Sequence, residues 1–375
     1  MNPTVFRNGG QGRPTLQAGF SLVELMVAML LGFLVVAAAG GVFLSNKRVY
    51  ASSETIGRIQ ENTRVAFELM SRDIREAGGN PCGAAVRPVN ILEGTNDIFW
   101  DRFNEGLTGY DGGNALPITA TGTAVGQRVA GTDAIELHGS LGGDVRVVEH
   151  DTPSANLQVT SIDGFVEGDI LLVCNISQSF IFQVTGFSAA GGGVSMGHNA
   201  GGGQSLNCSQ TFQVFDGDAD TDCNNGASSD VDYCFTELPG ANPQCDFGSL
   251  SPASVVRPGS VQWYIGNNDR QGRSLYRAIV TNRGSTAVPD TLLQRDEIAE
   301  GVENLTITYL EQGENAYTDA AGVADWGRVV ATRVELLMTG TEGALGGGEI
   351  EGTDGAVLQR TVAHVVSLRN REGTL

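Results

Sequence analysis

Residues 20–44 read FSLVELMVAMLLGFLVVAAAGGVFL, and this stretch decides how the chain begins. From Leu25 to Leu44 no residue carries a charge. A helix rises about 1.5 Å per residue, so this segment spans about 30 Å, which is the thickness of the hydrocarbon core of a bilayer. The sequence therefore predicts a transmembrane helix half over residues 20–44.

The charges around this segment predict its orientation. Arg7 and Arg13 precede it, and residues 1–19 contain no Asp or Glu. Short basic flanks stay in the cytoplasm, so the remainder of the chain is expected to be exported. Lys47 and Arg48 weaken the asymmetry, but they begin a long segment, where the rule has less force. We expect a single-pass inner-membrane protein with a periplasmic head.

The next segment has the pattern of an amphipathic helix. Apolar residues recur at steps of three and four from Ile56 to Ala77, with charged residues between them. The sequence Gly78-Gly79-Asn80-Pro81 then supplies a strong stop. Residues 45–77 are expected to continue the apolar segment as one helix of about 58 residues.

After Pro81 the sequence favours strands, because short runs rich in Val, Ile, Phe and Tyr are separated by Gly, Asn or Asp. No βαβ rhythm is present, so we expect antiparallel sheet and an α+β fold with a β-rich head over residues 78–375. Residues 188–258 form a Gly/Asp/Cys-rich insertion in this interpretation. The predicted strands cover residues 134–138, 145–150, 157–162, 170–174, 180–187, 212–215, 261–265, 275–281, 305–310, 329–338 and 357–368.

The six cysteines indicate an oxidising compartment. They are Cys82, Cys174, Cys208, Cys223, Cys234 and Cys245. An even number in a loop-rich stretch predicts structural disulfides, whose pairing the sequence leaves open. Zinc is the alternative, but the chain has no C-x-x-C pair, and its four histidines lie away from the cysteine cluster.

Composition and motifs argue against nucleic-acid binding and catalysis. The net charge of −20 repels phosphate backbones. No Walker A, H-E-x-x-H or zinc-ligand spacing is present. Gly193-Val194-Ser195-Met196-Gly197 matches G-x-S-x-G, but the glycines around it do not favour the strand–turn–helix that a nucleophile elbow needs. We expect a protein that is not an enzyme and has no catalytic residue.

An alternating acidic run suggests one cofactor. Asp216, Asp218, Asp220 and Asp222 resemble the oxygen-rich start of a calcium loop. The run departs from the EF-hand, because counting from Asp218 places Cys223 where Gly is needed and Ser229 where Glu is needed. A structural calcium site is the hypothesis, and a solvated acidic loop is the alternative.

Glu24 lies at the start of the apolar run, where a carboxylate usually needs a partner. The segment Gly19-Phe20-Ser21-Leu22-Val23-Glu24-Leu25 resembles the processing site of type IV prepilins. The resemblance implies a leader over residues 1–19, cleavage between Gly19 and Phe20 by the prepilin peptidase, and N-methylation of Phe20. It also implies that Glu24 pairs with the new amine of a neighbouring subunit, which would set the register of a helical bundle.

Four later segments resemble PilW-type minor pilins. They are Glu68-Leu69-Met70-Ser71-Arg72-Asp73-Ile74-Arg75, then Val261-Gln262-Trp263-Tyr264 with Ser274-Leu275-Tyr276-Arg277, then Gly301-Val302-Glu303-Asn304-Leu305, and finally Ser367-Leu368-Arg369-Asn370-Arg371. The resemblance implies a minor pilin that primes type IV pilus assembly and supports twitching motility and adhesion. Its expected partners are other minor pilins, the major pilin, the prepilin peptidase and the inner-membrane assembly platform. The bulky head suits the pilus tip.

Two alternatives stay open at this point. A pseudopilin of a type II secretion system uses the same N-terminal chemistry. A secreted soluble enzyme or adhesin would instead carry an ordinary signal peptide, cleaved near Ala37-Ala38-Ala39.

Overall fold

The computed structural model describes residues 19, 21–82, 88–92, 99–100, 102–142, 145–151, 154–190, 193–200, 205–212, 233–235, 252–283, 290–340 and 357–374. The chain divides into two compact units, Met1–Glu54 and Thr55–Leu375. We call the second unit the head. Helix α1 (Leu22–Glu76) supplies the described helix of the first unit and the first element of the head.

Among the described residues of the first unit, which form a helix from Leu22 onward, none is buried. Every described residue from Ser21 to Tyr50 is exposed, including the large apolar side chains between Leu22 and Leu44. The apolar part of α1 is long enough to cross a membrane. Apolar surface of this extent needs lipid or another helix to cover it.

The part of α1 that belongs to the head is amphipathic, whereas the part in the first unit is apolar on all sides between Leu25 and Leu44. Ile59, Phe67, Met70 and Ile74 are buried, and they recur at the spacing of one helix face. The helix ends at Glu76, one residue before the predicted end. Gly78 follows in the left-handed conformation (φ 72°), which a glycine adopts without strain.

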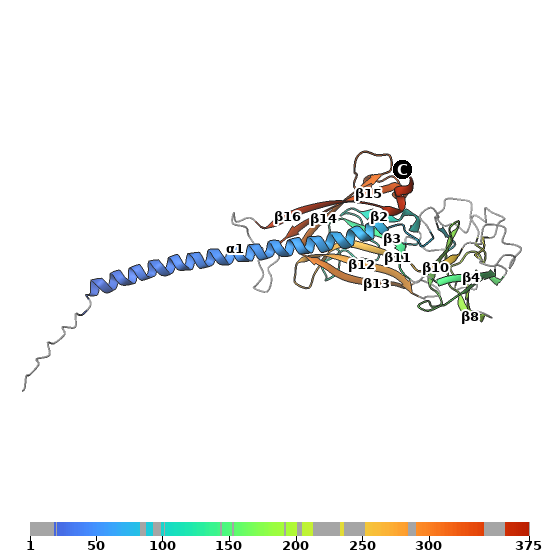
Figure 1. Cartoon of the computed structure of the whole chain (residues 1–375), viewed down its shortest axis with the longest axis horizontal. Helices are drawn as coiled ribbons and strands as arrows, with labels where there is room; N and C mark the ends of the chain where they lie inside the picture. The colour runs from blue at the N-terminus through green and yellow to red at the C-terminus, as the bar shows by residue number, and fades with distance from the viewer. Residues whose placement is uncertain are drawn as a thin grey trace, which may run out of the picture. The chain divides into compact units, whose positions relative to one another are not determined.

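Two sheets pack with this helix face. One has the order β13-β12-β11-β3-β2 and comprises β13 (Asp290–Glu300), β12 (Arg273–Arg283), β11 (Pro258–Asn267), β3 (Ala134–Ser140) and β2 (Leu107–Tyr110). The other has the order β14-β15-β16 and comprises β14 (Val302–Glu311), β15 (Val329–Thr339) and β16 (Gln359–Ser367). Both are antiparallel throughout. Their apolar side chains and those of α1 form one core. Figure 1 shows α1 running between β14 and β16 on one side and β12 and β13 on the other.

An eight-stranded sheet lies at the end of the head where Figure 1 labels β4, β8 and β10. Its order is β1-β7-β6-β10-β4-β5-β9-β8, and all pairs are antiparallel except β1 with β7. The strands are β1 (Val89–Asn90), β4 (Val145–Asp151), β5 (Asn156–Val159), β6 (Ile170–Cys174), β7 (Ser179–Gln183), β8 (Gly186–Ala190), β9 (Gly193–Gly197) and β10 (Ala253–Val256). Short 3-10 turns complete the described structure at Phe103–Glu105, Ala320–Gly322, Trp326–Arg328 and Arg369–Thr374.

The α+β class and the antiparallel pairing are confirmed. The expected single strand over 180–187 is wrong, because β7 ends at Gln183 and β8 begins at Gly186 at the opposite edge of the sheet. Residues 188–258 include β9 and β10, both of which belong to the eight-stranded sheet. The predicted strand at 212–215 lies outside the described residues except for Phe212, which bridges Tyr233.

Candidate functional site

Gly19 of the predicted cleavage site lies in the first unit, ahead of α1. Gly19 is described and exposed, whereas Phe20, the predicted cleavage partner and methylation site, lies outside the described residues. The described chain resumes at Ser21, and α1 begins one residue later. Gly19 is therefore exposed and lies outside the helix.

Ser21 and Glu24 cap the start of α1. The Ser21 hydroxyl accepts hydrogen bonds from the backbone N–H of Val23 (3.2 Å) and of Glu24 (3.4 Å). In return, the Glu24 carboxylate accepts one from the backbone N–H of Ser21 at 3.2 Å. This reciprocal pair is a capping box, with its S-x-x-E signature at residues 21–24. It satisfies donors that a helix start otherwise leaves open.

The capping box also shows what holds Glu24 in the single chain. Its carboxylate is exposed and bonded to a neutral backbone donor. A bond of this kind contributes only about 1 kcal/mol, so a charged amine could displace it. The sequence signal for this cap is the serine three residues before Glu24.

A second functional feature joins α1 to the head. Asp73 on α1 accepts two hydrogen bonds from the Arg277 guanidinium, at 2.6 Å from Nε and 3.2 Å from Nη2. The indole Nε1–H of Trp263 donates to the same carboxylate at 3.0 Å. The arginine and the aspartate are both largely buried, and Trp263 is fully buried. This arrangement fixes the helix on β11 and β12 through an ion pair, three directed hydrogen bonds and the packing of the Trp263 ring.

The end of α1 has its own clamp. The side-chain amide of Asn370 donates to the carbonyls of Glu76 (3.2 Å) and Ala77 (3.1 Å) at the helix end, where the backbone N–H of Gly79 also donates to the Glu76 carbonyl at 3.0 Å. Arg371 binds the carbonyl oxygens of Val329, at 3.1 Å, and of Trp326 and Glu105. The closing segment of the chain therefore covers the end of the helix.

Segments that resemble PilW-type pilins meet at the joint, by which we mean the contacts of α1 with Trp263, Arg277 and Asn370. Asp73 comes from the first of them, Trp263 and Arg277 come from the second, and Asn370 comes from the last. The remaining one, at residues 301–305, begins with Gly301 in the left-handed conformation (φ 75°) and buries Val302 in the same core. The resemblance therefore follows the residues that attach the helix to the head.

A buried network of charged and polar side chains surrounds Glu136. The carboxylate of Glu136, on β3, accepts hydrogen bonds from Gln262 Nε2 (2.9 Å), Ser260 Oγ (3.0 Å), Tyr110 Oη (3.2 Å) and Arg102 Nη2 (3.3 Å). His138 Nε2 is 3.5 Å from the same carboxylate. Burial raises the pKa of Glu136, but the hydrogen bonds and charges of His138, Gln262 and Arg102 outweigh it and lower this pKa to about 2. Burial and the nearby Glu136 carboxylate raise the pKa of Tyr110.

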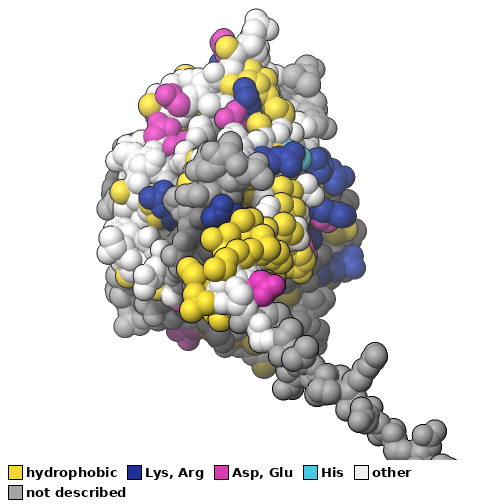
Figure 2. Space-filling model, turned by 90° about the vertical axis from the view of Figure 1, so that its left-hand side faces the viewer, with side chains coloured by type: hydrophobic (Ala, Val, Ile, Leu, Met, Phe, Trp, Pro, Cys, Tyr) yellow, Lys and Arg dark blue, Asp and Glu magenta, His cyan; other side chains and the backbone are white. Residues whose placement is uncertain are grey.

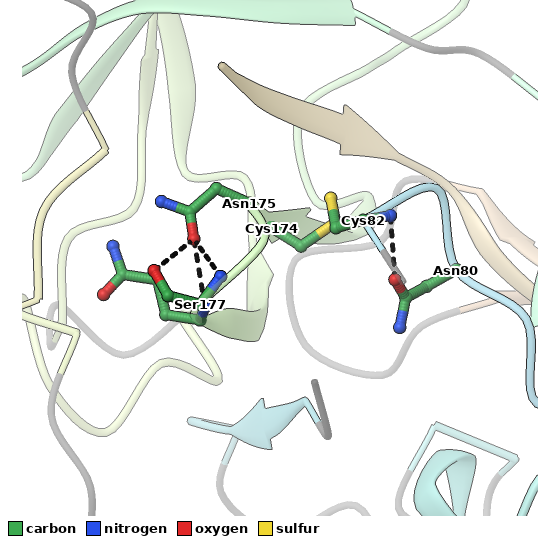
Figure 3. The surroundings of a disulfide bond; sticks show 6 residues. Asn80, Cys82, Cys174, Asn175 and Ser177 are labelled. Atoms are coloured by element: carbon green, nitrogen blue, oxygen red, sulfur yellow. Dashed lines mark hydrogen bonds between the residues drawn. A yellow bond between two sulfur atoms is a disulfide. The ribbon is translucent and has the colours of Figure 1, made fainter. Parts of the chain in front are cut away.

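The structure describes one complete disulfide and two further disulfide-bonded cysteines. Cys82 and Cys174 are bonded, with Cα atoms 5.9 Å apart, and they link the segment after α1 to the end of β6 (Figure 3). Figure 3 also shows the backbone turns on either side, in which Asn80 accepts from Cys82 and Asn175 accepts from Ser177. Cys208 and Cys234 are disulfide-bonded as well. Cys223 and Cys245 lie outside the described residues.

Two histidines that are distant in sequence meet in the eight-stranded sheet. The Nε2 atoms of His150 and His198 are 3.1 Å apart, and both side chains are buried. The backbone N–H of Phe235 donates to His150 Nδ1 at 3.4 Å, so His150 carries its proton on Nε2 and donates it to His198. Burial and the neighbouring His198 lower the pKa of His150, and burial lowers the pKa of His198 to about 3. Sequence spacing gave no signal for this pair.

The described residues do not build the chemical sites that were weighed from sequence. Residues 193–197 of the G-x-S-x-G match form strand β9 itself, with Ser195 buried between β5 and β8. Within the described ranges, no three His, Cys, Asp or Glu side chains could hold a metal ion together. Asp216, Asp218, Asp220 and Asp222 of the calcium hypothesis lie outside those ranges.

Comparisons with known proteins agree with this geometry. Residues 15–40 match the family model of the prokaryotic N-terminal methylation motif, and residues 262–370 match the model described as type IV pilus-assembly protein W. The searches of curated proteins and of solved structures each found no match. The first match contains the capping box, and the second contains Arg277, Asn370 and strands β12 to β16. These two matches support a prepilin-like pilin of the PilW type.

Proposed function

We propose that this protein is a minor pilin that primes assembly of a type IV pilus and stays at its tip, where it supports twitching motility and adhesion. The observation that carries the proposal is the division of α1. Its N-terminal part is exposed and apolar, and its C-terminal part is bonded to the head through Asp73 and Arg277. Such a helix can enter a bundle of similar helices while its head stays attached.

The proposed mechanism begins in the inner membrane, with the head in the periplasm. The prepilin peptidase removes residues 1–19 and leaves Phe20 with a methylated amine. The Glu24 carboxylate then exchanges its bond with Ser21 for the charged amine of a neighbouring pilin, which fixes the stagger between subunits. The apolar faces of the helices cover one another. The assembly platform and its motor supply the work, and this subunit performs no catalysis.

A tip position follows from size in this proposal. The head comprises more than 300 residues and includes the eight-stranded sheet beyond the core that holds α1. A packed shaft has little room for such a head, whereas a tip has no subunit above it. The partners in this scheme are other minor pilins and the major pilin.

Deletion of the gene tests the proposal against its closest rival. We expect loss of surface pili and of twitching, with protein export unchanged, and restoration of both by the wild-type chain. Loss of protein export with normal pili would assign the chain to a type II secretion system instead. Immunogold labelling of sheared pili should mark the ends, and labelling along the shaft would contradict the tip position.

A further inference from the structure

A groove of about 500 Å³ runs along the head between α1 and strand β16. Its α1 side includes Arg64, Phe67 and Arg75, and its β16 side includes Arg360 and His364. The floor is apolar and aromatic, because the rings of Phe67 and His364 stack at 4.0 Å with an angle of 12° between their planes. Figure 2 shows dark blue Lys and Arg side chains gathered beside an exposed histidine on this face.

Several arginines elsewhere in the head are held by carboxylates, unlike the three arginines that line this groove. Arg102, Arg257, Arg270, Arg273, Arg277 and Arg333 each form an ion pair with a carboxylate. Arg64, Arg75 and Arg360 are exposed, and among the described residues they have no such partner. Glu68 is the acidic residue in the lining of the groove, so three arginines leave it with a net positive charge. On a chain with a net charge of −20, such a groove indicates an anionic ligand.

The strand at the groove has an unused edge. β16 pairs with β15 on one side, and no described strand pairs with its other side. An edge of this kind presents backbone N–H and C=O groups that can bind another extended chain. Val365, on the opposite face of β16 from His364, is 60% exposed and offers apolar contact beside the edge.

We propose that this groove binds an acidic, extended segment of another protein, which adds to the free edge of β16 as a further strand. Arg360 and His364 lie four residues apart on β16, about 13 Å, so a segment of five to eight residues reaches both. Alternate side chains of the added strand point into the groove, and acidic ones there meet Arg64, Arg75 and Arg360. A lipid headgroup would use the charge but not the strand edge, and for that reason a peptide fits the groove better. That the segment belongs to another pilus subunit rests on the proposed function, whereas the binding chemistry does not.

The test uses the full chain in detergent micelles and fluorescent octapeptides measured by anisotropy. The probes are alternating Glu-Val, Gln-Val and Lys-Val peptides. We expect the Glu-Val peptide to bind at least tenfold more tightly than the other two, and more weakly as salt is raised. The double variant Arg64→Gln, Arg360→Gln should lose at least tenfold in affinity. Arg333→Gln is the matched control, because Arg333 is an exposed arginine of the neighbouring strand that already pairs with Glu335, and it should leave binding unchanged.

Backbone methylation of the peptide tests strand addition without altering the protein. Two Glu-Val peptides carry N-methyl groups on alternate residues, one on the odd and one on the even positions. A strand added to β16 uses only one of these sets for pairing, so one peptide should lose binding and the other should keep it. Equal binding of both, or equal binding of the Glu-Val and Lys-Val peptides, would overturn the proposal. If the protein binds anionic vesicles but no peptide, and the double variant abolishes vesicle binding, the groove is a lipid site instead. If the protein sediments as a dimer and the double variant sediments as a monomer, the groove mediates self-association instead.

Discussion

Arg277 holds Asp73 through two hydrogen bonds across 204 residues of sequence. The pair joins α1 to strand β12, and Trp263 on the neighbouring strand β11 adds a third bond to the same carboxylate. Force on the helix is therefore transmitted to β11 and β12 through three directed bonds as well as through the apolar core.

Breaking this pair should destabilise the head strongly. Arg277→Gln leaves the largely buried Asp73 carboxylate without its cation, and the free energy of unfolding should fall by about 2–4 kcal/mol. Urea unfolding of the full chain in micelles, followed by tryptophan fluorescence, measures this loss. Arg72→Gln is the control, because the pair of Arg72 with Glu76 is exposed and contributes less than about 0.5 kcal/mol. A loss no larger than that of the control would show that packing alone holds the helix.

The role of Glu24 separates into charge and hydrogen bonding. Glu24→Gln keeps an oxygen for the Ser21 N–H but removes the charge, whereas Glu24→Ala removes both. If the charge pairs with a neighbouring amine, both variants should reduce assembly into sheared pili by at least tenfold, while leader cleavage continues. Quantitative immunoblots of pili and of membranes supply the measurement. If Glu24→Gln entered pili as efficiently as the wild type, the Glu24 carboxylate would have only its role in capping the helix.

The disulfide Cys82–Cys174 should contribute much of the head's stability. It bridges two residues 92 positions apart and joins the segment after α1 to the eight-stranded sheet. The double variant Cys82→Ala, Cys174→Ala should lower the free energy of unfolding by about 2–5 kcal/mol. Urea unfolding of the wild type and the variant, in oxidising and in reducing buffer, measures this loss. The reductant should narrow the difference between their free energies of unfolding. An unchanged midpoint in oxidising buffer would show that the bond is not needed.

Acid should weaken the head in two steps. His150 and His198 are held neutral by burial, so the unfolded chain binds more protons than the folded chain below a pH of about 6.5, and stability falls from there as the pH drops. The lowered pKa of Glu136, about 2, gives stability that is present above a pH of about 4.5 and is lost as the pH falls toward 2. The double variant His150→Phe, His198→Phe should flatten the dependence of the unfolding temperature on pH between 6.5 and 5 and leave the lower step. A slope identical to that of wild type would contradict this assignment.

The local pattern of the sequence was enough for much of the fold. The apolar run, the amphipathic stripe and the glycine stop predicted α1 to within one or two residues at each end, and β6 occurs at the residues predicted. These elements are specified by short-range periodicity. β13 was missed because its central residues Gln294, Arg295, Asp296 and Glu297 are polar, which an edge strand exposed to water tolerates. β9 was missed because glycine-rich sequence weakens a strand signal, although its neighbours on both sides supply the pairing.

The candidate site was predicted only where it is local. Gly19, Phe20 and Glu24 lie within one short motif, and the roles that family resemblance gives them stay a prediction. The partners of Asp73 and Glu136 come from distant strands, and no spacing in a single sequence connects Asp73 to Arg277 or His150 to His198. Those contacts depend on strand order, which the sequence does not specify locally.

Mass spectrometry of the mature N-terminus, from cells with and without the prepilin peptidase, tests the central claim most directly. We predict a chain that begins at Phe20 and carries one methyl group on its amine, found only when the peptidase is present. A chain that begins near Gly40, or one that is processed identically without the peptidase, would contradict the account, because Glu24 would then have no pilin amine to meet.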